Sequence, residues 1–209
     1  MKSLRYFVCL MCIFLTFNFT SFSQNKKEII KSLSFKDKVW VMKNYSSVKK
    51  AFNISKNVLS VMDSLNKQNF LGGNTEGGKF DAFRHIYWTY SLTKEIGEEK
   101  ARRVGEIYEN YNKYMFFEKH VYGYDSISMV MDLFNNEIGI NLIKIEIDDS
   151  LIFNEITNII LSGGAKIVKK NTLEQSLDEN DNVIPEEEWK KKWINNRKLV
   201  NSNFKLNND

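Results

Sequence analysis

The sequence has few of the residues that cross-link or interrupt a chain. It contains two cysteines, Cys9 and Cys12, and both lie in the apolar run at residues 6–19. Without that run the chain has no disulfide, no thiolate zinc site and no cysteine nucleophile. Proline occurs once, at Pro185, and no proline-rich or serine-rich linker divides the chain. These absences favour one domain that is held together by its packed core.

Residues 1–23 have the pattern of a secretory signal peptide. Lys2 and Arg5 precede the apolar run, and Ser21 and Ser23 supply small residues before a cut after Ser23. The run is shorter than the ~20 residues of a membrane-spanning helix, which argues against the alternative of an N-terminal membrane anchor. No cysteine lies at the cut, which argues against a lipid anchor. We therefore expect an exported protein, periplasmic or extracellular, with no stable membrane anchor after cleavage.

The excess of positive over negative charge is also small. The formal net charge is +4 and falls to +2 without Lys2 and Arg5, because the signal peptide contains no acidic residue. This excess is too small to predict nucleic acid or an anionic membrane as the main partner. About 185 residues remain, which is enough for one domain with a substantial core. No repeat of solenoid length is present.

Apolar residues at three- and four-residue spacing account for most of the mature chain. They predict helices at residues 35–43, 46–67, 80–96, 98–117, 128–145 and 151–161. We expect an all-α fold, a single compact multi-helix domain around a central buried helix. After it come a short strand at 166–169 and a charged helix at 186–200 that begins after Pro185. The predicted units are a signal peptide at 1–23, a helical lead-in at 24–44, a helical domain at 45–165 and a C-terminal extension at 166–209.

The central helix at 80–96 carries charged residues among large apolar ones. Asp81, Arg84, His85 and Trp88 lie on one stripe, and aromatic and aliphatic residues cover most of the other faces. Buried charges are costly unless they are paired, so these groups need partners from other helices. The preceding linker contains the glycine pairs at 72–73 and 77–78. No Lys-Ser or Lys-Thr follows in P-loop register, so a tight turn explains them better than a phosphate site.

The helix at 128–145 repeats this arrangement. Asp132, Asn135, Asn136 and Gly139 have the same spacing as the polar stripe of the central helix. We therefore expect the two helices to lie side by side, with their polar residues facing each other. The only other histidine, His120, lies in a loop at 118–126, where a solvated side chain is the usual outcome.

Two motifs in this order resemble those of an uncharacterised bacterial domain family. Residues 78–88 contain D-A-F-R-H-x-x-W and residues 131–139 contain M-D-L-x-N-N-x-x-G. The family occurs in secreted and in toxin-like or wall-associated proteins, and the resemblance covers residues 45–165. It implies that the marked positions are Asp81, Arg84, His85, Trp88, Glu109, Asp132, Asn135, Asn136 and Gly139. The family often has His-Glu where this chain has Tyr108-Glu109, which puts a ligand or base at that place in doubt.

One interpretation of these residues is catalytic. His85 is then a general base or a metal ligand, oriented by Asp81 or Asp132. Glu109 and Asp132 add oxygen ligands, which with a histidine suit zinc, manganese or iron. Arg84 binds a phosphate or carboxylate. The candidate catalytic residues for hydrolysis of an ester or phosphoester are His85, Asp81, Arg84, Asp132 and Asn136, and the candidate metal ligands are His85, Glu109 and Asp132.

A second interpretation needs no ligand, and we favour it. Asp81 pairs with Arg84, His85 bonds Asp132 or an asparagine amide, and the network fixes helix register in a non-catalytic or degenerate domain. A third is a module of the cell envelope that binds a small ligand or a protein. No G-x-S-x-G or H-E-x-x-H motif supports a known hydrolase class. A cluster open to a cleft favours the enzyme, and an enclosed, mutually satisfied cluster favours the network.

Overall fold

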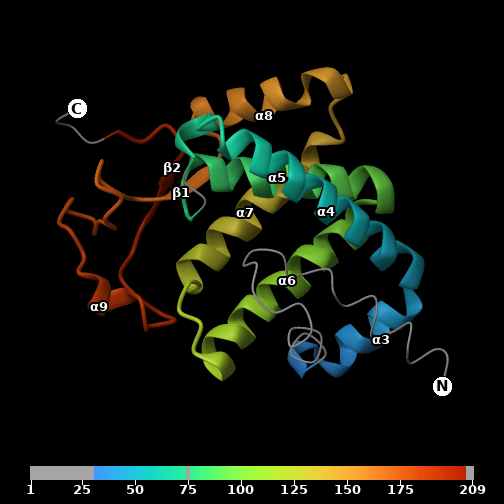
Figure 1. Ribbon diagram of the computed structural model, residues 1–209, viewed down its shortest axis with the longest axis horizontal. Helices are drawn as coiled ribbons and strands as arrows, with labels where there is room; N and C mark the ends of the chain where they lie inside the picture. The colour runs from blue at the N-terminus through green and yellow to red at the C-terminus, as the bar shows by residue number, and fades with distance from the viewer. Residues whose placement is uncertain (1–30, 74–75, 206–209) are drawn as a thin grey trace.

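The computed structural model describes residues 31–73 and 76–205 and is mainly helical (Figure 1). The helices are α3 (Phe35–Lys43), α4 (Tyr45–Asn66), α5 (Lys79–Ile96), α6 (Glu98–Lys119), α7 (Ser126–Leu142), α8 (Ile152–Leu161) and α9 (Glu186–Trp189). Short 3-10 turns occur at Phe70–Gly72 and Asp149–Leu151. The predicted all-α fold is confirmed. The predicted signal peptide and the start of the lead-in fall outside the described residues, among which no helix is long and apolar enough to cross a membrane.

Local capping explains where α3 begins. Ser34 is the N-cap of α3, and it forms a capping box with Asp37. Asp37 is buried because it also pairs with Arg103 of α6. Helix α4 begins at Tyr45, one residue before the expected start at 46, and Asn44 at its N-cap makes no side-chain capping bond.

Helix α5 lies at the centre of the fold and packs against α4, α6, α7 and α8 (Figure 1). Phe83, Ile86 and Leu92 have no measurable exposure, so they form the middle of the hydrophobic core. Trp88 donates its indole N–H to Ser55 Oγ on α4 at 2.9 Å. The predicted adjacency of the helices at 80–96 and 128–145 is confirmed, because α7 packs along α5.

Helices α5 and α7 lie close together at Gly139. A Cβ atom on Gly139 would lie 2.2 Å from the carbonyl oxygen of Ile86 and 2.3 Å from Thr89 Oγ1. Thr89 Oγ1 lies 2.9 Å from the carbonyl oxygen of Asn136, so the two helices are also linked by a hydrogen bond. This contact brings the polar stripes of the two helices together.

The C-terminal extension follows the helical bundle and returns to it. Strand β1 (Lys166–Val168) pairs antiparallel with β2 (Leu199–Asn201), which confirms the short strand predicted near 166–169. The charged helix predicted at 186–200 is wrong in length, since α9 ends at Trp189. Two contacts oppose a longer helix. Arg197 pairs with Asp125 at 2.6 Å, and the following residues join the sheet.

Candidate functional site

Helices α5, α6 and α7 bring six polar side chains into one buried group, which we call the polar cluster. Its members are Asp81, Arg84 and His85 from α5, Glu109 from α6, and Asp132 and Asn136 from α7. His85 and Glu109 are only 2% and 1% exposed. The structure therefore brings together residues that the repeated spacing predicted to face each other, and it encloses them.

Asp81 is held by a backbone turn and by Arg84. The N–H of Gly77 donates to Asp81 Oδ2 at 2.7 Å, and Arg84 Nη2 donates to Asp81 Oδ1. Gly77 has a φ of 73°, in the left-handed region that favours glycine. A Cβ atom there would also meet Val168 Cγ2 at 2.8 Å. The glycine pair thus forms the predicted tight turn, and it also binds a carboxylate.

The hydrogen bonds of His85 define which ring nitrogen carries the proton. Arg84 Nη2 lies 3.1 Å from Nε2, and a guanidinium has only donors, so Nε2 is the acceptor. Nδ1 then carries the hydrogen and donates to Asn136 Oδ1 at 3.0 Å. The tautomer is assigned from these partners. Asn136 therefore orients the ring so that Nε2, whose lone pair accepts from Arg84, lies beside the acidic residues.

Two carboxylate oxygens lie close to that lone pair. His85 Nε2 is 3.3 Å from Asp132 Oδ1 and 3.7 Å from Asp81 Oδ1. Asp132 Oδ1 still has no hydrogen-bond partner, because in the assigned tautomer Nε2 has no hydrogen to donate to it. The three atoms lie within 4.8 Å of one another, a spacing that can hold a metal ion. The cluster is thus not satisfied by its own members.

Glu109 is the most enclosed acid of the cluster. Its Oε2 accepts from Asn112 Nδ2 at 3.3 Å, and its Oε1 has no hydrogen-bond partner among the described residues. Three carboxyl groups, those of Asp81, Glu109 and Asp132, thus share this core with the single guanidinium of Arg84. If all ionise, the buried group has an excess of negative charge, which a low-dielectric core disfavours.

The pKa values of the cluster reflect this excess. Burial, with a smaller contribution from Arg84, lowers the pKa of His85 to about 4, so the imidazole is neutral at neutral pH. Burial raises the pKa of Glu109 to about 8. Burial, followed by the charges of Glu109 and Asp81, raises the pKa of Asp132 well above its usual value. Without a further cation, Glu109 and Asp132 hold their protons to higher pH than ordinary carboxyl groups.

Several predicted residues have other roles. Asn135 donates to the carbonyl oxygen of Lys166 and accepts from its N–H, so it anchors β1 instead of joining the cluster. Trp88 bonds Ser55, and its ring lies edge-on to that of Tyr108 at 5.7 Å. Tyr108 is thus a packed core residue. His120 is exposed and stands at the C-terminal end of α6.

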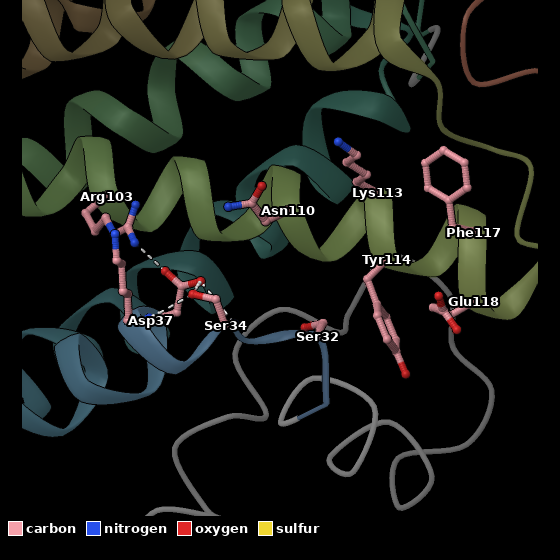
Figure 2. Close-up of a pocket in the computed structure, with 10 residues that line it drawn as sticks. Ser32, Ser34, Asp37, Arg103, Asn110, Lys113, Tyr114, Phe117 and Glu118 are labelled. Atoms are coloured by element: carbon pink, nitrogen blue, oxygen red, sulfur yellow. Dashed lines mark hydrogen bonds and ion pairs between the residues drawn. The ribbon is translucent and has the colours of Figure 1, made fainter.

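A surface hollow of about 510 Å³ lies elsewhere, between the start of α3 and the second half of α6 (Figure 2). Asp37 and Arg103 pair at one end of it, and Lys113 and Tyr114 lie further along α6 (Figure 2). It shares no lining residue with the polar cluster. We place the candidate site at the cluster, because Asp37 and Arg103 in this hollow already pair with each other, whereas the cluster has unbonded buried oxygens.

Two contributors to the site were not predicted from the sequence. The first is the N–H of Gly77, since the glycine pair at 77–78 was expected only to form a tight turn. Gly105 on α6 was not singled out, yet a Cβ atom there would lie 3.1 Å from Asn136 Nδ2. Its position on the apolar side of α6 is the only signal in the sequence, since a glycine inside a helix often marks a close contact.

The fold and the cluster together define a helical domain with a buried, acid-rich polar centre. A family model described as "Domain of unknown function (DUF6973)" matches residues 38–164. The match covers more than half of the chain, which therefore belongs to this family. This confirms the predicted membership of an uncharacterised domain family. No curated protein and no solved structure matches the chain.

Proposed function

We propose that this domain binds a divalent metal ion in the polar cluster, with His85 Nε2, Asp81 Oδ1 and Asp132 Oδ1 as ligands. One observation carries the proposal: Asn136 orients the imidazole so that Nε2 lies close to two carboxylate oxygens, one of which has no hydrogen bond. Metal-bound histidines are typically oriented in this way, through a hydrogen bond from their other nitrogen.

The spacing of these atoms supports the proposal. Ligand atoms about 2.0–2.1 Å from a zinc ion in tetrahedral geometry lie roughly 3.3 Å apart. The histidine-to-carboxylate distances here are 3.3 and 3.7 Å. One nitrogen and two oxygens, without sulfur, suit zinc, manganese or iron.

The charge balance of the polar cluster also supports metal binding. A divalent ion offsets the surplus of carboxylates over guanidinium and replaces the protons that Asp132 and Glu109 otherwise retain. It also supplies a partner for Asp132 Oδ1. We therefore favour a network completed by a metal over the self-contained network expected from the sequence, which leaves oxygens of Asp132 and Glu109 unbonded.

Calorimetric titration of the chelator-treated protein with Zn²⁺ and Mn²⁺ tests the proposal. We expect about one ion per chain and a higher melting temperature in its presence, since a ligand that binds only the folded state stabilises it. His85→Ala and Asp132→Asn should each abolish this binding, whereas His120→Ala should retain it. The metal-free structural network would be supported instead if a chelator leaves the melting temperature of wild type unchanged and His85→Ala lowers the free energy of unfolding by ~1–3 kcal/mol.

Metal-assisted hydrolysis of an ester or phosphoester is a second candidate. The side chains of Arg84 and Asp132 are 15% and 11% exposed, more than those of Asp81 and His85, so this edge of the cluster is the one nearest to solvent. A metal there can activate water, and Arg84 can bind an anionic group. Nitrophenyl ester and phosphate substrates, with metal-loaded wild type and His85→Ala, provide the test. Equal rates for the two proteins would exclude His85 from catalysis.

We also propose that the chain is exported, because residues 1–23 have the three regions of a signal peptide. Intact-mass measurement of protein from the extracytoplasmic fraction should give a chain that begins near Gln24. A chain that retains Met1 in the membrane fraction would contradict this.

A further inference from the structure

We propose that Arg84 is a built-in counter-cation that competes with the metal ion for the polar cluster, so that metal entry displaces its guanidinium. This inference rests on the metal site proposed above and adds how access to that site is controlled. Arg84 Nη2 contacts Asp81 Oδ1 and lies 3.1 Å from His85 Nε2. These are two of the three proposed ligand atoms.

The competition follows from the lone pairs of the imidazole. A neutral imidazole has one unprotonated nitrogen, and that nitrogen has a single lone pair in the ring plane. Nδ1 donates to Asn136, so Nε2 is the only nitrogen left to accept. It either accepts an N–H of Arg84 or binds a metal, but not both. The guanidinium and the ion are also both cations, and they repel each other at this range.

The position of Arg84 allows it to leave. Its side chain is 15% exposed, against 3% for His85 and 6% for Asp81, so it lies at the solvent side of the atoms that it contacts. An arginine side chain is long and flexible, so its charged end can reach water while its methylenes stay packed. In the metal-free protein, Arg84 compensates the carboxylates; after metal entry its charge is available at the edge of the cluster.

The test compares Zn²⁺ affinity in wild type, Arg84→Met and Arg84→Lys, by calorimetry with chelator-treated protein. Methionine replaces the aliphatic stem of arginine and carries no charge, so we expect it to tighten binding by about tenfold or more, an effect of the size seen for residues around metal sites. The Arg84→Lys variant keeps a competing cation, so its affinity for Zn²⁺ should stay near that of wild type. Arg103→Gln, which removes a guanidinium paired with Asp37 outside the cluster, should leave the affinity unchanged.

The results separate this inference from the metal site itself. If wild type binds Zn²⁺ and Arg84→Met binds it equally or more weakly, the competition is overturned and the metal site stands. If only Arg84→Met binds, the competition is supported and the metal site of the natural chain is overturned. If neither binds, both are overturned.

A second measurement applies if Arg84→Met does not fold. The side-chain N–H resonance of Arg84, assigned with the Arg84→Lys variant, is followed in wild type during Zn²⁺ titration. We expect it to shift and to exchange faster with solvent as the ion enters. A resonance that stays unchanged while zinc binds would overturn the inference.

Discussion

Glu109 illustrates what a single buried acid does to the stability of this protein. It has a raised pKa of about 8 in the folded protein, against 4.5 for an ordinary glutamate. Between these values the folded chain holds a proton that the unfolded chain has released. The free energy of unfolding therefore falls as the pH rises through this range, because the unfolded state binds fewer protons.

We therefore expect Glu109→Gln to weaken the pH dependence of stability in chelator-treated protein. The comparison is made by urea unfolding between pH 6.5 and 8. Across this window unfolded His85, with its ordinary pKa of 6.5 against about 4 in the folded protein, adds the same positive slope to wild type and variant, so its contribution cancels in the comparison. Wild type should lose more stability than the variant as the pH rises. Glu106→Gln, a change in a more exposed acid paired with Arg103, should behave as wild type. Parallel curves for wild type and Glu109→Gln would contradict the prediction.

At the residue scale, the sequence predicts which side chains meet but not how they bond. The spacing places Asp81, Arg84 and His85 opposite the polar residues of α7. It cannot separate Asn135 from Asn136, which are adjacent and chemically identical. The structure does so, because Asn136 bonds His85 and Asn135 bonds the backbone of β1. The histidine tautomer is likewise a tertiary property, since it depends on Arg84 and Asn136 together.

At the element scale, the contact between α5 and α7 depends on the absence of a side chain at Gly139. We expect Gly139→Ala to destabilise the protein by about 1–3 kcal/mol or more, because the added methyl group meets the backbone of Ile86 and forces the helices apart. Chemical unfolding measures the change. Gly123→Ala is the matched control: a Cβ atom there meets nothing within 4 Å, and its effect should stay within about 0.5 kcal/mol. Equal effects of the two changes would refute this account of the packing.

Helices were predictable here where an apolar stripe runs their full length. The bounds expected for the central helix, 80–96, agree with α5 to within one residue at each end. The helix expected at 186–200 is much shorter in the structure, and the cause lies in tertiary contacts. The composition of this segment permits a helix. However, Arg197 forms an ion pair with Asp125 and stacks on Trp189, where the guanidinium carbon lies 4.3 Å from the ring centre. Long-range contacts therefore override local propensity in this segment.

At the scale of the whole molecule, the C-terminal extension is tied to the bundle by the buried pair of Arg197 and Asp125. Removing the Arg197 guanidinium leaves the Asp125 carboxylate buried without this cation. We therefore expect Arg197→Met to lower the free energy of unfolding by about 3 kcal/mol. Hydrogen exchange should show faster exchange of the amides in β1 and β2. Lys198→Met removes a surface pair with Glu179 and should cost less than about 1 kcal/mol. Unchanged protection in Arg197→Met would mean that the pair does not hold the extension.

The contact of β1 with the turn before α5 bears on where this domain ends. Val168 donates its N–H to the carbonyl oxygen of Gly77, and Ser202 Oγ donates to the carbonyl oxygen of Ile160. The family match stops at residue 164, before either donor. A fragment cut at that boundary would therefore lose the partners of the Gly77 turn that binds Asp81, and of the Asn135 side chain. The hydrogen bonds that hold the helical part thus extend beyond the matched segment, and we expect gene fragments that fold to extend beyond Ser202.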